Sequence, residues 1–374
     1  MIIGLFPGLG TVGGVQVAGR QTAAALGAIG HDRGWRCAFL SLNDARGEQE
    51  TGVGGKHFHF TGFARAKFRF AMQALRLARE KPKVIWAAHP NLAPIAAMMR
   101  ALSKDARTIV GAHGIEVWHP LPVARRRALR RANVVVAPSS DTVRRLTTVQ
   151  GVLGNKICVL PWPLDPEFAE FTRCVEKLSR PEGFPSGQVV LSVGRWAANE
   201  RYKGADLLIQ AIGEFSQDFP QIHLVLVGSG DDLPRLKQLV QTFGVEKSVH
   251  FFPAVSRREL AACYASADIF ALPSTGEGFG IAFLEAMAFG KPVIGVDAGG
   301  IPDVVENGRE GLLIEPVADS VSSALRRLLS DQDLCKQMGK LGRQRVNIEF
   351  TYETFQQRLM SILNEVIYSK PHEN

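Results

Sequence analysis

Short apolar segments alternate with helical ones along most of the chain, and this alternation constrains the fold more than any other feature. In the first half, Ile2–Phe6, Val84–Ala88 and Arg107–Ala112 read as strands that are followed by helical patterns. The alternation resumes at Val189–Val193 and continues to Leu312–Ile314. Short β-branched runs that alternate with helices are typical of parallel, doubly wound sheets. The sequence therefore predicts an α/β protein whose ligands bind beyond the carboxyl ends of the strands.

A proline-rich segment interrupts this alternation near the middle of the chain. Five prolines lie between residues 161 and 187, which is typical of an inter-domain connection. A chain of 374 residues is also long for one hydrophobic core. We therefore expect a first Rossmann-like domain over residues 1–163, a linker over 164–187 and a second Rossmann-like domain over 188–351. Within the first domain, the polar, glycine-rich residues 43–56 predict a loop.

Charge is distributed unevenly between the two halves. Residues 1–180 hold 26 Lys and Arg against 12 Asp and Glu, whereas residues 181–374 hold 18 against 24. This asymmetry suggests two domains that face different partners. The chain has no apolar run of about 18 residues, and its N-terminus lacks the pattern of a signal peptide. The five cysteines are scattered singly, which favours reduced thiols in the cytoplasm over a disulfide framework or a zinc site.

The stretch Thr275–Val296 combines a glycine turn with two carboxylates. It follows an apolar strand, and its helix is expected to begin near Phe279. Backbone N–H groups at such a helix start attract phosphate oxygens. Glu277 lies in the turn, and Glu285 is expected about two turns into the helix. Carboxylates beside an anion site are unfavourable unless they bind other groups, such as sugar hydroxyls.

A second loop carries two cations at the same predicted edge. Gly194-Arg195 and Lys203-Gly204 follow the first strand of the second domain. An arginine fork and a lysine point charge can converge on a diphosphate. The alternative is two solvated charges on a loop, and the neighbouring glycine-rich helix start favours the phosphate interpretation.

Three further features allow more than one interpretation. The N-terminal Gly8-Leu-Gly-Thr-Val-Gly13 matches a dinucleotide-binding pattern, but Asp44 supplies the expected acidic residue only loosely. His113 follows a strand on the ligand edge, where it could bind a substrate hydroxyl or be structural. His250 and Phe251 close another strand, which is either a nucleobase contact or an ordinary buried strand end.

We expect no metal site. Asp331-Gln-Asp333 is formally an Asp-x-Asp motif, but it lies where a late helix is expected to begin. That context favours an N-cap, in which the carboxylate accepts backbone hydrogen bonds at the helix start.

Two arginine clusters suggest a surface that binds anions. A helix is expected over Gly62–Glu80, with Phe63, Phe70, Ala74 and Leu77 on its apolar side. Its basic side carries Arg65, Arg69, Arg76 and Arg79, and a second cluster contains Arg126, Arg127 and Arg130. Such a helix suits an anionic membrane surface, whereas the alternatives are a solvated helix face or RNA binding. RNA binding has no stacking motif or recognised module to support it.

Taken in order, these motifs resemble the retaining glycosyltransferases of family 4, which have the GT-B fold. The resemblance spans nearly the whole chain and is strongest from Val189 to Leu313. It rests on Gly13-Gly14-Val15, His113-Gly114, Gly194-Arg195 with Lys203-Gly204, Glu277 to Glu285 with seven residues between them, Gly299-Gly300-Ile301-Pro302 and Glu306-Asn307-Gly308. The family's fold implies two Rossmann-like domains facing a central cleft, with a C-terminal helix, here 352–374, that crosses back to the first domain.

The resemblance also implies a role for each matching residue. Arg195 and Lys203 would bind the donor diphosphate, Glu285 the ribose and Glu277 the sugar hydroxyls. The amides of Phe279, Gly280 and Ile281 would reach the phosphates, with Gly194 beside them. From the first domain, His113 would contact the sugar, and Gly14 would lie against the donor phosphate and the acceptor.

The implied function is hexosyl transfer from a UDP- or GDP-sugar to a lipid-linked or growing saccharide, without a metal or other cofactor. The expected partners are the nucleotide-sugar, the acceptor and an anionic membrane surface, and not nucleic acid. The expected location is the cytoplasm, peripheral to the inner face of the plasma membrane. The alternatives are a nucleotide-sugar epimerase or phosphorylase of the same fold, an NAD-dependent oxidoreductase, and a catalytically silent basic module.

Overall fold

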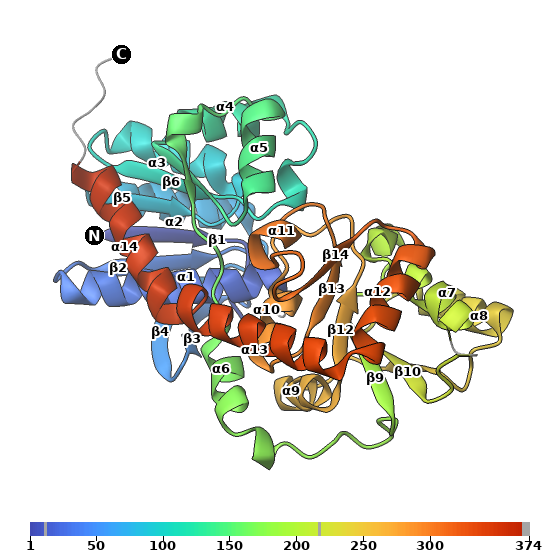
Figure 1. Ribbon diagram of the computed structural model, residues 1–374. Coiled ribbons are helices and arrows are strands. Elements are labelled where there is room, and N and C mark those ends of the chain that lie inside the picture. The colour runs from blue at the N-terminus through green and yellow to red at the C-terminus, as the bar shows by residue number, and fades with distance from the viewer. Residues whose placement is uncertain (11–12, 216–217, 369–374) are drawn as a thin grey trace. The chain divides into compact units, whose positions relative to one another are not determined.

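The computed structural model describes residues 1–10, 13–215 and 218–368 of the chain (Figure 1). It divides into two compact units: Met1–Pro166 together with the segment from Thr351, and Glu167–Phe350. The segment expected to be a linker is partly helical, because it contains α6 (Pro166–Arg173) and the 3-10 helix η4 (Val175–Lys177). Each unit is a parallel-sheet α/β structure, as the sequence predicts.

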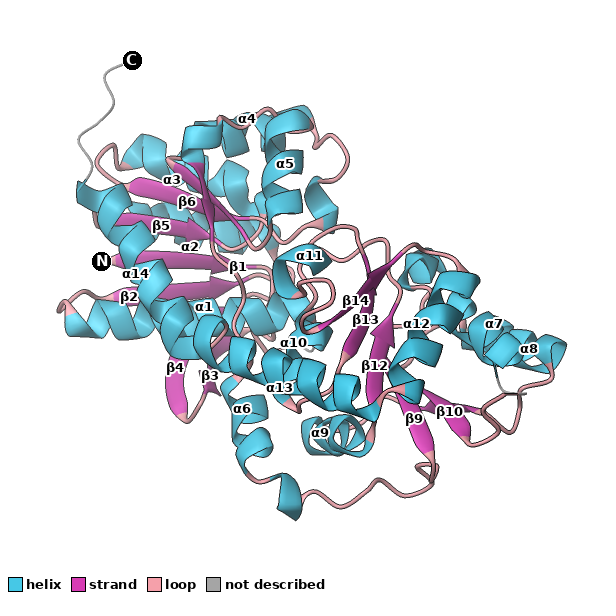
Figure 2. Cartoon of the chain, viewed as in Figure 1, coloured by secondary structure: helices cyan, strands magenta, loops and turns pink. Residues whose placement is uncertain are grey.

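The first unit contains an eight-stranded sheet in the order β3-β4-β2-β1-β5-β6-β7-β8. Strands β2, β1, β5 and β6 are seen side by side in Figure 2. All neighbouring strands are parallel except β3 and β4. The central strands are buried along their whole length, which explains their uniformly apolar sequences. The strands are β1 (Ile2–Phe6), β2 (Cys37–Ser41), β3 (Gly47–Val53), β4 (Lys56–Gly62), β5 (Val84–Ala87), β6 (Arg107–Gly111), β7 (Val134–Ala137) and β8 (Ile157–Val159).

Strand β3 corrects the sequence prediction, because residues 43–56 do not form a plain loop. Gly47–Val53 pairs antiparallel with β4 at the edge of the sheet. Its residues are polar and partly exposed, so no apolar run marks it. The informative signal is Gly54-Gly55, since both residues have positive φ in the connecting turn and such glycine pairs favour β-hairpins.

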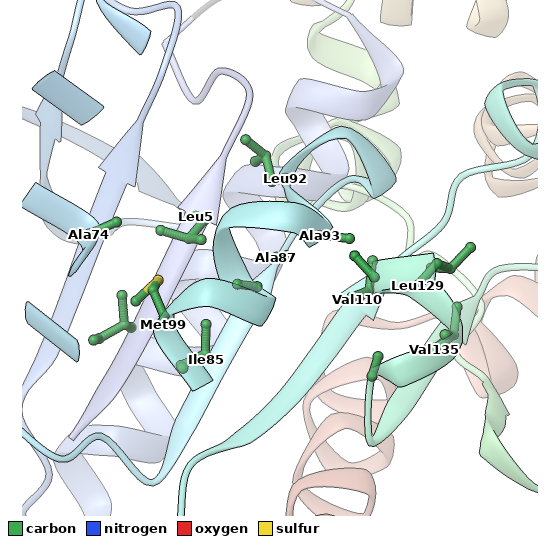
Figure 3. Packing of buried hydrophobic residues seen from close by; sticks show 14 of the residues in the cluster. Leu5, Ala74, Ile85, Ala87, Leu92, Ala93, Met99, Val110, Leu129 and Val135 are labelled. Atoms are coloured by element: carbon green, nitrogen blue, oxygen red, sulfur yellow. The ribbon is translucent and has the colours of Figure 1, made fainter. Parts of the chain in front are cut away.

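Helices cover both faces of this sheet. One face packs against α1 (Gly14–Asp32) and α14 (Tyr352–Tyr368), so the end of the chain completes the core of the unit in which the chain begins. The Tyr352 hydroxyl donates to the Gln21 carbonyl at 3.1 Å across these two helices. The other face packs against α2 (Lys67–Ala78), α3 (Ala93–Leu102), α4 (Val123–Arg131) and α5 (Ser140–Thr148), and Figure 3 shows part of this core. Short 3-10 helices lie at η1 (Pro90–Leu92), η2 (Ile115–Val117) and η3 (Gly154–Lys156).

Helix α2 is shorter than the expected Gly62–Glu80. The residues before it form a turn in which Ala64 and Arg65 adopt left-handed conformations. Their backbone N–H groups donate to the carbonyls of Asp44 and Leu42, both at 2.7 Å, so the turn is fixed by the loop after β2. Arg65 therefore precedes the helix, and Arg79 is its C-cap residue.

The second unit contains a fully parallel six-stranded sheet in the order β11-β10-β9-β12-β13-β14. Its strands are β9 (Gln188–Val193), β10 (Ile222–Val227), β11 (Val249–Phe252), β12 (Ile269–Leu272), β13 (Val293–Val296) and β14 (Gly311–Ile314). Besides α6, the unit contains η5 (Ala198–Lys203), α7 (Ala205–Phe215), α8 (Leu233–Phe243), α9 (Arg257–Ser266), α10 (Ile281–Ala288), α11 (Ile301–Val304), α12 (Ala318–Ser330) and α13 (Gln332–Glu349). Asp331 caps α13 by accepting from the Leu334 N–H at 2.9 Å, which confirms the N-cap prediction.

The cysteines and the lengths of the helices bear on two predictions that were made from composition. All five cysteines are free thiols, in agreement with the absence of a disulfide framework. Within the same residues, every helix is too short or too polar to cross a bilayer.

Candidate active site

The strand order of the second unit brings together the two loops that carry the predicted site residues. The chain reverses its direction of winding between the adjacent strands β9 and β12, and ligands of open α/β sheets bind at such a switch point. The loop after β9 carries Arg195 and Lys203, and the loop after β12 carries Glu277. These two loops are also joined directly, because the Thr275 N–H donates to the Tyr202 carbonyl at 2.9 Å.

Lys203 and Glu277 form the centre of this site. The Lys203 ammonium donates to Glu277 Oε1 at 3.0 Å, and the two side chains are only 14% and 18% exposed. Glu200, which is 9% exposed, lies 4.0 Å from Lys203 and forms an ion pair with Arg195. The two cations predicted to bind a diphosphate are therefore each held by a carboxylate. Low exposure strengthens the Lys203–Glu277 pair relative to a surface pair, whereas the Arg195 side chain is 71% exposed and its pair with Glu200 is more strongly screened by solvent.

Glycines allow the backbone around Glu277 to pack closely. Gly299 has φ of 61°, and a Cβ there would lie 2.4 Å from the Glu277 carbonyl oxygen. A Cβ on Gly300 would lie 2.4 Å from the Gly278 carbonyl oxygen, and the Gly300 N–H donates to the Glu277 carbonyl at 2.8 Å. The motif that begins at Gly299 thus fixes the backbone that carries Glu277.

Gly194 also has close neighbours, which are the Lys203 side chain and the glycine that follows β10. A Cβ on Gly194 would lie 3.3 Å from the Lys203 side chain, so glycine leaves room for that side chain to pass. A Cβ on Gly228 would lie 1.8 Å from the Gly194 carbonyl oxygen, and one on Gly230 would lie 1.9 Å from the Trp196 carbonyl oxygen. The glycines after β10 therefore serve to pack against the loop after β9.

Helix α10 presents its N-terminus and Glu285. It begins at Ile281, two residues later than expected, so Glu285 lies one turn into the helix rather than two. Its N-cap is Gly280, which has φ of 107° and no side chain to cap the first turn. The Phe279 side chain is 1% exposed and packs on Phe350, so any phosphate contact of this residue would use its backbone.

A buried tyrosine orients Glu285. The Tyr264 hydroxyl donates to Glu285 Oε2 at 2.9 Å, and the Tyr264 ring stacks on Phe289 with a centroid distance of 6.0 Å. Burial, followed by the negative charge of Glu285, raises the pKa of Tyr264 well above its usual value, so it stays a hydrogen-bond donor. The carboxylate is thus held in one orientation.

In the first unit, His113 lies at the carboxyl end of β6. Its Nε2 lies 2.6 Å from the Ala88 carbonyl oxygen, which can only accept, so Nε2 carries a proton. In the neutral ring, Nδ1 is therefore the acceptor, and it is buried without a partner among the described residues. The neighbouring His89 was not singled out from the sequence. Burial is the main cause that lowers its pKa to about 4.

The glycine turn after β1 does not present Asp44 to a nucleotide. The Asp44 carboxylate is 4% exposed and accepts from the N–H groups of Leu9 and Gly10 at 2.6 and 3.1 Å and from the Ser41 hydroxyl at 2.5 Å. Those bonds occupy the group that a dinucleotide ribose would need. Residues 11 and 12 of the motif lie outside the described residues, and Gly14 is the first residue of α1.

Comparisons with known proteins show which family the chain belongs to. Residues 12–168 match the model of Glycosyltransferase Family 4, and residues 175–345 match that of Glycosyl transferases group 1. A GDP-mannose-dependent alpha-(1-6)-phosphatidylinositol monomannoside mannosyltransferase of Mycobacterium tuberculosis is 32% identical over 301 residues, 77% of either chain. The chain belongs to glycosyltransferase family 4. A GDP-mannose-dependent monoacylated alpha-(1-6)-phosphatidylinositol monomannoside mannosyltransferase of Corynebacterium glutamicum is 33% identical over 297 residues, 72% of this chain and 74% of that protein.

Solved structures show that this family 4 glycosyltransferase has the GT-B fold. A sucrose-phosphate synthase of Thermosynechococcus elongatus superposes with a TM-score of 0.78, covering 99% of this chain and 100% of its own, at 21% identity. Anabaena HepE in complex with UDP superposes with a TM-score of 0.73, covering 97% and 99%, at 18% identity. The GT-B prediction is therefore confirmed, and the oxidoreductase alternative is not favoured.

Two contacts of the candidate site were missed from the sequence. Glu200 lies in a polar loop without a readable pattern, so nothing in its neighbours marks it. Tyr264 lies in the mainly apolar segment of α9, and a buried tyrosine needs a partner for its hydroxyl, which is the signal that could have revealed it.

His250 and Phe251 lie within β11, the strand that they were predicted to close. The His250 ring lies 3.0 Å from the His223 ring nitrogen, and Lys237 lies over the Phe251 ring at 5.8 Å. The nucleobase contact of these two residues stays a prediction.

The two arginine clusters predicted from the sequence lie on α2 and α4 of the first unit and on the residues that flank α2. Arg65, Arg69, Arg76 and Arg79 are exposed in or beside α2, whereas Phe63, Phe70, Ala74 and Leu77 are buried, as expected. Arg126, Arg127 and Arg130 lie on α4. The side of α2 that faces solvent also carries Phe68 and Met72, which are 78% and 55% exposed.

Proposed function

We propose that this enzyme transfers a mannosyl group from GDP-mannose to a lipid-linked, inositol-containing glycan with retention of anomeric configuration. The observation that carries the proposal is the convergence of two cations, two carboxylates and a helix N-terminus at the switch point of the second unit. Arg195 and Lys203 would bind the diphosphate, with Gly194 and the amides from Phe279 to Ile281 beside them. Glu285 would bind the ribose and Glu277 the sugar hydroxyls.

The chemistry follows from the charges that develop during transfer. The bond between the anomeric carbon and the diphosphate oxygen breaks, and the acceptor hydroxyl oxygen bonds to that carbon from the same face. The hydroxyl proton passes to an oxygen of the departing diphosphate. Arg195 and Lys203 stabilise the charge on this leaving group, so we propose that no metal ion is required. We assign Glu277 to hydroxyl binding rather than to nucleophilic attack, because Lys203 already holds it.

The identity of the donor and acceptor comes from the relatives, whose names specify GDP-mannose and phosphatidylinositol mannosides. The test measures GDP release from GDP-mannose with and without phosphatidylinositol monomannoside in mixed micelles, with UDP-sugars in parallel. We expect release only with acceptor, and unchanged release in EDTA. Transfer from UDP-sugars alone would overturn the donor assignment, and loss of activity in EDTA would overturn the metal-free mechanism.

We also propose that the first unit binds the anionic inner face of the plasma membrane. The exposed arginines of α2 and α4 would attract acidic headgroups, while Phe68 and Met72 would enter the interface. A groove of about 330 Å³ on α4 is lined by Val123, Arg126, Arg127 and Arg130 together with Arg131.

The membrane proposal predicts a charge-dependent flotation. Reversal of Arg65, Arg69, Arg76 and Arg79 to glutamate should abolish flotation with vesicles that contain phosphatidylglycerol. The matched control reverses four exposed cations of the second unit to glutamate and should float normally; these are Lys237, Lys247, Arg327 and Lys340. Equal flotation of the two variants would remove the proposal.

A further inference from the structure

A hollow lies between α3 and α4 in the first unit, with β6 as its floor. Its volume is about 340 Å³, and Thr108 and Val110 of β6 line its base. The space exists because its walls are small side chains, which are Ala93, Ala96, Ala97, Ala101, Ala128 and Ala132. The alanines of α3 recur at helical spacing, so they share one face of that helix. In Figure 3, Ala93 on α3 and Val110 on β6 are seen among the buried side chains near this space.

The remaining lining residues are all cations. Arg100, Lys104 and Arg131 line the hollow, and none of its lining residues is acidic. The Arg100 guanidinium donates to the Arg131 carbonyl at 2.9 Å, so it links the two helices. In the described part of the chain, none of these three cations forms an ion pair with a carboxylate. The hollow therefore combines apolar walls with unneutralised positive charge.

The two helices that wall the hollow also carry exposed apolar side chains. Met98 and Leu102 on α3 are 54% and 52% exposed, and Val123 on α4 is 73% exposed. Helix α2, which carries Phe68, packs beside α3 on the same face of the sheet. Clustered exposed apolar side chains on a soluble protein usually mark a site of membrane or protein contact.

We propose that this hollow binds one acyl chain of an anionic bilayer phospholipid. The phosphate of that lipid is bound by Arg100, Lys104 and Arg131. The inference rests on the proposed membrane binding and adds a specific lipid site to it. A volume of about 340 Å³ lies within the usual range for small-molecule sites. Free phosphate or nucleic acid would not use the alanine walls, and a neutral chain would not use the three cations.

The hollow is separate from the ligand edge of the first sheet, where His113 is predicted to contact the sugar. It runs beside Thr108 and Val110 and is lined by Lys104, which precedes β6, whereas His113 follows the carboxyl end of that strand. We therefore assign the site to a lipid of the bilayer and not to the acceptor. It would fix the first unit on the membrane by burying a chain in addition to attracting headgroups.

Monomeric alkyl phosphates test the hollow without a bilayer. Butyl, hexyl and octyl phosphate are titrated by calorimetry, and each buried methylene should raise the affinity about fourfold. Ala97→Leu fills the hollow and should weaken octyl phosphate binding at least tenfold, whereas Ala124→Leu, on α4 outside the hollow, should not. Lys104→Glu should weaken binding of all three phosphates, while the exposed control Lys56→Glu should not. If Ala97→Leu lowers the melting temperature, Ala101→Leu at a more exposed wall position replaces it.

The outcomes separate this inference from the proposed function. Flotation with phosphatidylglycerol vesicles should weaken in Ala97→Leu, while GDP binding and transfer to a water-soluble acceptor should not change. Any one of three results would overturn the lipid site. The first is an affinity that does not depend on chain length, and the second is equal binding of octanol and octyl phosphate. The third is equal binding of octyl phosphate by Ala97→Leu and Ala124→Leu. Absence of transfer by the wild-type enzyme, with chain-length-dependent binding intact, would overturn only the proposed function.

Discussion

The pairing of Lys203 with Glu277 predicts that removing a carboxylate will strengthen nucleotide binding. The diphosphate must share Lys203 with Glu277, whose Oε1 lies 3.0 Å from the ammonium. The Coulomb attraction over that distance is about 5.5 kcal/mol at an effective dielectric constant of about 20. Desolvation offsets most of it, and a hydrogen bond to a charged group contributes about 1.5–3 kcal/mol net. Glu277→Gln should therefore raise GDP affinity by about tenfold, which corresponds to about 1.4 kcal/mol.

The same substitution should have the opposite effect on turnover. If Glu277 binds the sugar hydroxyls, transfer from GDP-mannose should fall by about 100-fold, the order of magnitude for loss of a charged contact that strengthens in the transition state. Calorimetry with GDP and steady-state kinetics with GDP-mannose measure the two effects separately. Glu246→Gln, an exposed carboxylate of the same unit, serves as the control and should change neither.

A double-mutant cycle identifies the cause of the tighter binding. In a Lys203→Ala background, Glu277→Gln should no longer raise GDP affinity, because the competition for Lys203 has been removed. Lys340→Ala, an exposed lysine of α13, is the matched control for loss of a cation. Weaker GDP binding in Glu277→Gln, or a gain that persists without Lys203, would falsify the competition between the carboxylate and the diphosphate.

Three further predictions concern the surroundings of the site. Tyr264→Phe should weaken GDP binding by roughly fivefold by calorimetry, since Glu285 loses the hydroxyl that orients it, and an unchanged affinity would contradict this role. Gly299→Ala should lower the urea midpoint of unfolding more than Gly308→Ala does. Both positions have positive φ, but only at Gly299 would the added Cβ lie 2.4 Å from a carbonyl oxygen. Equal decreases in the midpoint would refute the close packing at Gly299. His89 has a pKa lowered to about 4, so its stabilising contribution is complete above its unfolded value of 6.5 and is lost as the pH falls toward 4. In urea unfolding, the free energy of unfolding of the wild type should fall by about 1–2 kcal/mol more than that of His89→Asn between pH 7 and pH 5. Equal decreases in the two proteins would show that His89 does not cause this pH dependence.

The predictions that succeeded rest on strong local patterns. The strands of the second sheet were readable because burial on both faces makes them uniformly apolar, as in Ile269–Leu272. The loops after β9 and β12 were located because parallel strands end at the same edge. The strand order then brings Lys203 and Glu277 together although 74 positions separate them.

The features that were missed depend on contacts with distant residues. Strand β3 is polar because it lies at a sheet edge, so its sequence resembles a loop. The start of α2 is set by hydrogen bonds from the turn at Arg65 to the loop after β2. Glu200 gains its importance only from its neighbours Arg195 and Lys203, and no local pattern reveals such a partnership.

The return of α14 to the first unit has a consequence for synthesis of the chain. Phe355, Leu359 and Leu363 are at most 2% exposed in the core that the first 166 residues begin. At about 5–20 residues per second, the ribosome needs on the order of 10–40 s after Pro166 before this helix is made. The second unit, which is continuous in sequence, can complete its core sooner. The first unit must therefore wait on the ribosome with one face of its sheet covered by α1 alone, and a stop codon ahead of α14 would leave the rest of that face exposed permanently.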